Sequence, residues 1–244
     1  MYAFIINAQS GHGKGRRIWE KVRKKADRLG LEYEFYLTNQ KADVAKAFEA
    51  LARNQELKAV IAVGGDGTVQ GMLSHVMDLD LPLGVIPAGS GNDFARALAV
   101  PPSPEQALDY VLNGTVSDMD LIQIDERYGL TIAGTGLDAE VAFHFDHSWY
   151  KQTLSAVKLG TLGYLFSLLA VFLKFQPVSL SLTIDGKTYD YKNVWMAAVG
   201  NTPYYGGGMK VCPAAKPDDG MLEICLIHGG TPLKLLFGIL PRIF

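Results

Sequence analysis

The chain has 244 residues, enough for one large domain or two modest ones. Hydrophobic residues make up 48% of it and charged residues 20%, which excludes an intrinsically disordered chain. The net charge of -2 argues against nucleic acid as the main partner, because phosphate backbones favour strongly basic surfaces. The two cysteines, Cys212 and Cys225, form neither a CxxC pair nor a zinc-binding spacing. We therefore expect a cytoplasmic protein with buried thiols.

The first part of the chain alternates between strand and helix patterns. Apolar runs predict the strands, and apolar residues at helical spacing predict the helices. In chain order, these elements are strand 2–6, helix 14–29, strand 33–37, helix 41–53, strand 58–63, helix 68–77, strand 83–87 and helix 104–112. Repeated strand–helix units indicate a parallel sheet covered by helices, and therefore an α/β fold.

The first helix is strongly basic. Its cations are more typical of a solvated helix face than of a ligand site; they are Arg16, Arg17, Lys21, Arg23, Lys24 and Lys25.

The third strand runs directly into a glycine loop, and this junction is the most informative stretch of the chain. The apolar run 60–63 is followed by Gly64-Gly65-Asp66-Gly67-Thr68. Glycines allow a sharp turn and a close approach of the backbone to a ligand. Asp66 lies at the carboxyl end of the strand, where open α/β sheets bind their ligands, and Thr68 lies at a positive helix end. The pattern predicts a phosphate site with a carboxylate beside it for Mg2+; a simple glycine turn with a capping aspartate is the alternative.

Two more strand–loop junctions have the same character. After the first strand comes Asn7-Ala-Gln-Ser10-Gly11-His-Gly-Lys14-Gly, which lacks the spacing of a P-loop. After the strand 83–87 comes Ala88-Gly-Ser90-Gly-Asn-Asp93-Phe-Ala-Arg96. Three such loops within a hundred residues predict a nucleotide-phosphate site where the carboxyl ends of the strands meet.

The second half of the chain is rich in strands. Patterns at 117–124, 128–133, 178–184, 188–199 and 221–227 predict them. Asp185-Gly186 predicts a hairpin turn between two of them. We expect an N-terminal parallel-sheet nucleotide-binding domain over 1–117, followed by a β-rich, antiparallel sandwich domain over 118–244 with an inserted helix at 150–175.

The most apolar part of that inserted helix, 159–175, is shorter than the roughly 20 residues that a membrane span needs. A packed helix is the favoured reading, and a helix that partly meets a membrane surface is the alternative.

In their order along the chain, the motifs closely resemble those of the bacterial diacylglycerol-kinase-like lipid kinases. The resemblance spans essentially the whole sequence. The stretches that carry it are Gly64–Thr68 (GGDGT), Gly89–Arg96 (GSGNDFAR), Gly136–Ala139 (GLDA), Gly200-Asn201, Tyr205–Gly208 (YGGG) and Asp218–Gly220 (DDG).

The resemblance implies a two-domain lipid kinase that uses ATP and Mg2+. It implies phosphate and ribose contacts from Asn7, Ser10 and Gly11, a nucleoside contact from Thr38, and phosphate contacts from Gly64, Gly65, Asp66, Gly67, Thr68 and Ser90. The catalytic aspartate network would be Asp66, Asp93 and Asp120. A structural Mg2+ site would use Lys216, Asp219 and Met221, the first and third through backbone carbonyls.

The acceptor implied by the resemblance is the hydroxyl of a membrane lipid, with diacylglycerol giving phosphatidic acid as the leading case. Which lipid alcohol is used stays open. We expect a cytoplasmic protein with peripheral contact to the membrane surface, and a homodimer is plausible from the resemblance.

One departure from the family pattern bears on catalysis. The family's proposed general base is the glutamate of a D-G-E motif, and no D-G-E occurs in this sequence. We therefore expect a C-terminally truncated second domain and a chain that binds nucleotide but phosphorylates poorly. Two rival functions stay open. One is a non-catalytic nucleotide-binding or regulatory protein, and the other is an NAD kinase-like enzyme, which shares the GGDGT motif.

Overall fold

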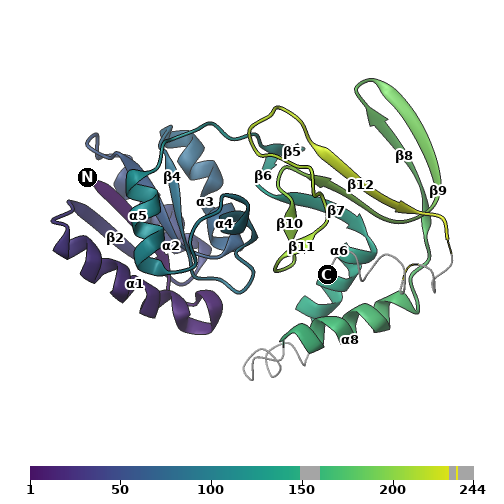
Figure 1. The fold of residues 1–244 in the computed structure, drawn as a ribbon, viewed down its shortest axis with the longest axis horizontal. Helices are drawn as coiled ribbons and strands as arrows, with labels where there is room; N and C mark the ends of the chain where they lie inside the picture. Colours follow the sequence, from purple (N-terminus) through teal and green to yellow (C-terminus); the bar gives the residue numbers. More distant parts are fainter. Residues whose placement is uncertain (149–159, 231–234, 236–244) are drawn as a thin grey trace. The chain divides into compact units, whose positions relative to one another are not determined.

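The computed structural model describes residues 1–148, 160–230 and 235, in two compact units (Figure 1). The first unit contains Met1–Thr131 together with Tyr204–Gly208, and the second contains Ile132–Pro203 and Met209–Phe244. The first unit therefore recruits a short segment from far along the sequence. The boundary that the sequence predicts after residue 117 stays a prediction.

The first unit is built on a four-stranded parallel sheet. Its strands are β1 (Tyr2–Asn7), β2 (Tyr33–Thr38), β3 (Ala59–Gly64) and β4 (Leu83–Pro87), in the order β2-β1-β3-β4. The chain moves outward from β1 in opposite directions, so the order of the strands reverses between β1 and β3. In open α/β sheets, ligands bind beyond the carboxyl ends of the strands at such a reversal. All four strands agree with the sequence predictions to within one residue at each end.

Helices cover both faces of this sheet. They are α1 (Ser10–Arg28), α2 (Lys41–Leu51), α3 (Asp66–Leu79), α4 (Asp93–Ala97) and α5 (Pro104–Asn113). The helices α1 and α5 contact each other and the sheet, and α2 and α3 do the same. This is the layered α/β arrangement that the alternating sequence pattern predicts.

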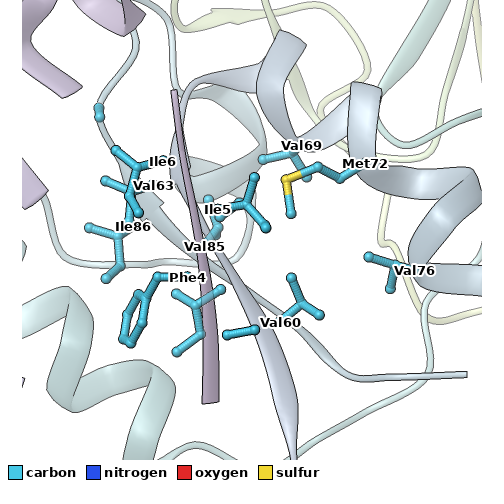
Figure 2. Close-up of a cluster of buried hydrophobic side chains, with 14 of the residues drawn as sticks. Phe4, Ile5, Ile6, Val60, Val63, Val69, Met72, Val76, Val85 and Ile86 are labelled. Carbon is cyan, nitrogen blue, oxygen red and sulfur yellow. The ribbon is translucent and has the colours of Figure 1, made fainter. Parts of the chain in front are cut away.

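The core of the first unit lies between the sheet and its helices (Figure 2). Phe4 and Ile6 point to one face of β1, where Phe4 meets the ring of Trp19 on α1 at 5.0 Å between centroids. Ile5 points to the other face, toward Met72 on α3. Strands buried on both faces are nearly continuous apolar runs, which explains why 60–63 contains no polar residue. This packing fixes the strand ends that carry the loops.

A small hairpin follows the parallel sheet. It consists of β5 (Ile122–Ile124) and β6 (Arg127–Gly129). The prediction of a strand over 117–124 is wrong for 117–121, where two aspartates, poor strand formers, precede the short strand. The side chain of Gln70 on α3 holds the end of the hairpin: it donates to the carbonyl of Tyr128 at 2.6 Å and accepts from the amide of Leu130 at 3.3 Å.

The second unit contains an antiparallel sheet with β9 (Lys187–Gly200) at its centre. β9 pairs with β7 (Ile132–Gly136), β8 (Val178–Ile184) and β12 (Glu223–His228). Asp185 and Gly186 form the predicted hairpin turn, with φ of 48° and 77°. The strand predicted over 128–133 is instead divided between β6 and β7, because the two halves pair in different sheets. Two short strands follow β9 along the chain: β10 (Tyr204–Tyr205), in the segment that belongs to the first unit, and β11 (Met209–Lys210).

Two helices pack together in the second unit, α6 (Leu137–Asp146) and α8 (Gly160–Phe172). The single helix predicted over 150–175 is wrong at its end, because the helix stops at Phe172; residues 149–159 lie outside the described part of the chain. Trp195 of β9 stacks on Phe172 at 5.6 Å between ring centroids, which places α8 against the sheet. Within the described residues, no helix is both long and apolar enough to cross a membrane.

Candidate functional site

The three predicted glycine loops come together at the carboxyl edge of the parallel sheet. A β-carbon on Gly11 in the first loop would lie 2.4 Å from the carbonyl oxygen of Ala88, at the start of the third. A β-carbon on Gly89 would lie 2.5 Å from the Cα atom of Gly65 in the second. Both distances are shorter than any real carbon contact, so glycine is required where the loops touch. The structure therefore joins three segments that are far apart in the sequence.

The first loop takes an unusual backbone path. Gly11, His12 and Gly13 all have positive φ, at 55°, 60° and 81°. His12 is a non-glycine residue in the left-handed region, which is uncommon. The regular part of α1 begins only after this turn, later than its first residue, Ser10. A strained turn of this kind is often found at a ligand site.

Asn7 connects the first loop to the second. Its side-chain oxygen accepts the amide of Gln9 at 3.1 Å, and its side-chain nitrogen donates to the hydroxyl of Thr68 at 3.0 Å. Thr68 in turn folds back over Gly64, where a β-carbon would lie 2.4 Å from the threonine Oγ1. Asn7 and Thr68 thus fix the carboxyl ends of β1 and β3 together, at the reversal of the strand order.

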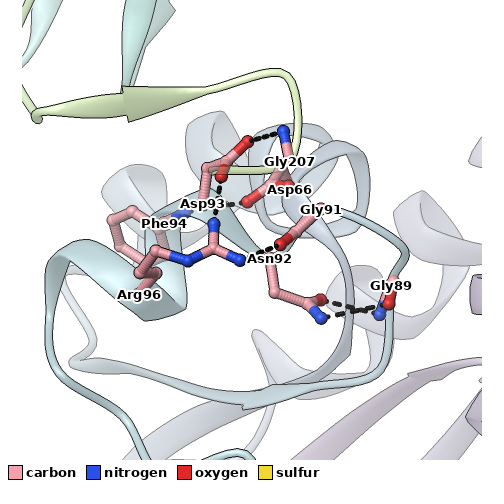
Figure 3. Close-up of polar contacts among 8 residues, drawn as sticks. All are labelled: Asp66, Gly89, Gly91, Asn92, Asp93, Phe94, Arg96 and Gly207. Carbon is pink, nitrogen blue, oxygen red and sulfur yellow. Dashed lines mark hydrogen bonds and ion pairs between the residues drawn. The ribbon is translucent and has the colours of Figure 1, made fainter. Parts of the chain in front are cut away.

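Asp66 and Asp93 place two carboxylates beside this junction (Figure 3). Each is the first residue of a helix, α3 and α4 respectively. Asp66 Oδ1 accepts the amide of Phe94 at 2.9 Å. A β-carbon on Gly91 would lie 3.1 Å from Asp66 Oδ2 and 3.3 Å from Asp93 Oδ2, so both carboxylates flank Gly91. The two predicted catalytic aspartates are therefore neighbours, and the small residue between them keeps the space open.

Both oxygens of Asp93 are engaged. Oδ2 accepts the amide of Gly207 at 2.7 Å, and Oδ1 forms an ion pair with Arg96 (Figure 3). Burial raises the pKa of Asp93 above its usual value; the amide of Gly207 lowers this pKa, and the nearby charge of Asp66 raises it. Asp93 is 7% exposed and Arg96 is 40% exposed, so solvent screens the pair on the arginine side. Positive charge arriving near Asp66 and Asp93 would relieve their mutual repulsion.

The third loop is closed by its own asparagine. Asn92 accepts the amide of Gly89 at 2.7 Å and donates to the carbonyl of the same residue at 3.0 Å. Asn92 adopts a positive φ of 55°, and Ser90, at the tip of the loop, is exposed. The hydroxyl predicted to contact phosphate is thus accessible on a loop of fixed shape.

Two other predicted residues lie differently. Thr38, at the end of β2, is buried, and its hydroxyl donates to the carbonyl of Ile6 at 3.1 Å. This side chain therefore supports the sheet, and a nucleoside contact stays a prediction. Asp120 is half-buried in the irregular segment before β5.

The predicted structural metal site is a turn in the second unit. Asp219 accepts the amide of Met221 at 3.0 Å, Gly220 has a φ of 72°, and Lys216 is exposed. A carboxylate and two main-chain carbonyls form a set of oxygen donors that suits Mg2+. In the described part of the chain, no group of three or more His, Cys, Asp or Glu side chains is placed so that it could hold a metal ion. Binding of Mg2+ here would thus depend on carbonyls and water as well as on Asp219.

The sequence indicates Tyr205–Gly208 as one of the family motifs but predicts no contact between it and the aspartates of the site; the structure adds the segment Tyr204–Gly208 to the site. The amide of Gly207 binds Asp93, and the guanidinium of Arg96 lies over the ring of Tyr204 at 5.8 Å. Gly206, Gly207 and Gly208 all have positive φ. Their run in the sequence was a usable signal, because three successive glycines favour such a turn, but their partner could not be read from it.

A groove of about 1110 Å³ lies in the second unit. It is lined mainly by apolar side chains of α6, α8 and the start of β8, including Phe143, Phe166, Val171 and Val178. Glu140 and His144 contribute polar groups. A groove of this composition suits a ligand with a long apolar part and a small polar part.

The chain belongs to the diacylglycerol-kinase-like lipid kinase family of bacteria. The family profile "Diacylglycerol kinase catalytic domain" matches residues 1–124. A second profile, "YegS C-terminal NAD kinase beta sandwich-like domain", matches residues 131–244. Together these profiles confirm the resemblance that the sequence motifs indicate, and the fold agrees with it.

Curated relatives and solved structures agree with this assignment. The chain is 31% identical to the diacylglycerol kinase of Mycobacterium tuberculosis (strain H37Rv), over 98% of this chain and 77% of that protein. It is 30% identical to the diacylglycerol kinase of Bacillus subtilis (strain 168), over 91% of this chain and 72% of that protein. A crystal structure described as a diacylglycerol kinase from Bacillus anthracis (strain Sterne) matches with a TM-score of 0.73 and 26% identity, covering 96% of this chain and 75% of that one.

Proposed function

We propose that this chain is an ATP- and Mg2+-dependent lipid kinase that transfers the γ-phosphate of ATP to the hydroxyl of diacylglycerol. The observation that carries the proposal is the pair of carboxylates, Asp66 and Asp93, beside the junction of three glycine loops. Phosphoryl transfer depends mainly on positioning and charge neutralisation, and glycine loops with nearby carboxylates provide the groups for both.

In this proposal, the first and second loops hold the phosphates of ATP. Asn7 fixes the shape of the first loop through its bonds to Gln9 and Thr68. The N-terminus of α3 directs free amides and a positive dipole toward the same edge of the sheet. Ser10, Gly11 and Ser90 then supply further hydroxyl and amide groups for the phosphate oxygens.

Asp66 and Asp93 have different roles. Asp66 uses one oxygen for the amide of Phe94, and we assign the other to Mg2+ and its waters. When bound, Mg2+ neutralises the charge on the phosphate oxygens. Asp93 has both oxygens engaged, so it orients Arg96 and the Gly207 segment and adds negative charge beside Asp66. A hydroxyl acceptor also needs a group that takes its proton. With Asp66 Oδ2 assigned to Mg2+ and no D-G-E motif in this sequence, we assign that proton to water and expect slow transfer.

Two observations favour a lipid acceptor. The relatives named above are diacylglycerol kinases, and the second unit contains a groove lined mainly by apolar side chains. We propose that this groove receives an acyl chain. The enzyme must then contact the membrane, because the acceptor lies in the bilayer. We propose that this contact is peripheral.

The experiment that tests the proposal is transfer of labelled γ-phosphate from ATP, with Mg2+, to lipid alcohols in mixed micelles. Diacylglycerol, phosphatidylglycerol, undecaprenol and a sphingoid base would be compared, with NAD as a non-lipid acceptor. Labelled phosphatidic acid, absent in Asp66→Ala, is the expected result. Labelled NADP would instead indicate an NAD kinase. Bound ATP with no labelled product would indicate a non-catalytic nucleotide-binding protein.

A further inference from the structure

The chain first passes from the first unit to the second directly after Thr131. We name the segment that leads to this point, residues 128–131, the connector. It runs from the end of β6 to the start of β7. The hairpin before it has only three residues in each strand. An isolated two-stranded hairpin is marginally stable at best, so the connector needs support from another element.

The side chain of Gln70 on α3 supplies this support. Its amide nitrogen donates to the carbonyl of Tyr128 at 2.6 Å, and its amide oxygen accepts from the main-chain amide of Leu130 at 3.3 Å. These two main-chain groups flank Gly129, so one side-chain amide meets both, as a residue of a neighbouring parallel strand would. The planar amide of Asn or Gln provides the donor and the acceptor that this requires. The connector is therefore bound to α3 by two hydrogen bonds.

Gln70 also has a fixed position relative to the phosphate site. It lies four residues after Asp66, one turn along the same face of α3. Asp66 is the first residue of that helix and holds the amide of Phe94 on α4. Because a helix is a rigid element over a single turn, a ligand that fixes the start of α3 also fixes Gln70.

The other crossings of the chain are anchored beside the same site. The chain returns to the first unit for the segment Tyr204–Gly208 and then leaves again. In this segment the amide of Gly207 donates to Asp93, and the ring of Tyr204 lies under the guanidinium of Arg96. The side chains that hold the chain near its crossings thus come from α3 and α4, the two helices that begin with the carboxylates of the site.

Stability alone does not account for the contacts of Gln70. Its side chain is exposed, and a hydrogen bond of this kind contributes only modestly to folding. Leu130 is buried in the core of the first unit, which fixes its side chain but not the direction in which the main chain continues. The bonds from Gln70 act on that direction, because they hold main-chain groups on both sides of Gly129, a residue with wide conformational freedom.

We infer that Gln70 is a positioning residue for the proposed transfer: it ties the connector to the helix whose N-terminus holds the phosphates of ATP. The inference rests on the proposed function, because it concerns an acceptor bound by the second unit and a donor bound by the first. Transfer requires the two in a defined geometry, and a displacement of about 1 Å can lower the rate by about 100-fold. A looser connector would leave ATP binding intact and slow the transfer to lipid.

The test compares substitutions at two glutamines. Gln70→Glu keeps the size of the side chain and the acceptor for the amide of Leu130, but replaces the donor with a second acceptor facing the carbonyl of Tyr128. Gln70→Leu removes both bonds. Gln123→Glu and Gln123→Leu are the matched controls, since Gln123 on β5 is also exposed and its amide donates within the hairpin, to the carbonyl of Asp125 at 3.1 Å.

Each full-length protein is measured in three ways. Calorimetry gives the affinity for a non-hydrolysable ATP analogue with Mg2+, and transfer of labelled phosphate to diacylglycerol in mixed micelles gives kcat and the KM for ATP. Hydrogen exchange at the amide of Leu130, with and without the analogue, reports on the connector itself.

The wild-type protein is expected to exchange the Leu130 amide more slowly when the analogue is bound, because the phosphates steady the start of α3. Both Gln70 variants should keep the affinity and the KM for ATP within about twofold and lose about 10- to 100-fold in kcat. In Gln70→Leu the analogue should no longer slow the exchange. Both Gln123 variants should behave as the wild type does in all three measurements.

An unchanged kcat in the Gln70 variants would overturn the inference. An affinity for the analogue that falls together with kcat would also overturn it, because Gln70 would then act on the phosphate site itself. Equal losses in the Gln123 variants would do the same, because any disturbance of the hairpin would then be enough.

Hydrogen exchange separates this inference from the proposed function. A wild-type protein that binds the analogue but phosphorylates no lipid would contradict the proposed function, and the exchange at Leu130 would then decide whether Gln70 links the connector to the phosphate site. Lipid transfer that is independent of Gln70 would contradict the inference alone. No binding of the analogue by the wild type would contradict both.

Discussion

The two units of the molecule use their polar and apolar side chains in opposite ways. In the first unit, polar side chains gather at one edge of the sheet, and each of Asn7, Asp66, Asn92 and Asp93 holds a group from another part of the unit or closes a loop. In the second unit, large apolar side chains stay exposed on its helices or directly after them, including Phe143 on α6 at 66% and Leu173, just after α8, at 84%. The first arrangement is preorganised for a small charged ligand, and the second offers apolar surface.

This contrast indicates where substitution should matter. At the sheet edge, a single atom added or removed changes how three loops meet. On α8, truncation of an exposed side chain removes little that the fold depends on. The following variants test this difference between the two units.

The largest effect is expected for Asp66→Ala. Its carboxylate holds the amide of Phe94 and is our candidate ligand of Mg2+, so phosphoryl transfer should fall by about 10²–10³-fold or more. The matched control is Asp78→Ala, which removes an exposed aspartate from the same helix. Initial rates of lipid phosphorylation measure both. A loss of the same size in the control would show that the assay reports general charge and not the site.

The next effect is on stability. Ile61 is fully buried in β3, so Ile61→Ala should lower the free energy of unfolding of the first unit by about 2–5 kcal/mol. Leu173→Ala, in the exposed turn directly after α8, should change stability by less than about 0.5 kcal/mol. Urea unfolding followed by circular dichroism measures both. Comparable losses would mean that the exposed apolar residues of the second unit are part of its fold.

Gly89→Ala tests the contact between the second and third loops. Its new β-carbon would meet the backbone of Gly65 at 2.5 Å, and the resulting shift should cost about 1–3 kcal/mol. Gly67→Ala is the control, since a β-carbon there meets nothing within 4 Å; within α3 it should stabilise by up to about 1 kcal/mol. Thermal unfolding measures the pair. The change in stability should have opposite signs in the two variants. Equal changes would contradict the close approach of the second and third loops.

The smallest effect concerns pH. The folded-state pKa of Asp93 is raised, so the folded protein holds this proton more tightly than the unfolded chain. The associated stability is present below the unfolded pKa and is lost as pH rises through the folded pKa. Asp93→Asn should abolish this pH dependence, so its stability should change less than that of the wild type between acid and neutral pH, although the variant loses the ion pair with Arg96 and its transfer activity falls. Urea midpoints at acid and neutral pH measure this difference. An Asp93→Asn protein that is less stable than the wild type only at neutral pH would contradict the prediction.

The sequence predicted the first unit more fully than the second, for a physical reason. Apolar runs such as 60–63 can only be buried strands when they alternate with helices, and the ends of those strands then place the glycine loops. The close approach of Gly65 to Gly89 follows too, because these glycines come just after the neighbouring parallel strands β3 and β4. The union of Gly207 with Asp93 does not, because 114 residues separate them and neither carries a local signal for the other.

From the boundary between the two units onward, local pattern was a weaker guide. The run 128–133 looks like one strand, but pairing with two different partners divides it between β6 and β7. The hairpin at Asp185-Gly186 was predictable because the turn itself requires those residues. Pairing partners and the ends of α8 depend on contacts that the local sequence does not specify.

The central claim is that the three loops together form a site for the phosphates of ATP. Calorimetric titration of Mg2+ and a non-hydrolysable ATP analogue into the wild type and Asn7→Ala tests it most directly, because the side chain of Asn7 links the first loop to Thr68. Asn54→Ala, which alters an asparagine far from the sheet edge in the same unit, is the control. We expect binding by the wild type and the control, and affinity lowered at least about tenfold in Asn7→Ala, the loss of about 1.4 kcal/mol that two hydrogen bonds can supply. Equal affinity in all three proteins, or no binding by the wild type, would contradict the claim.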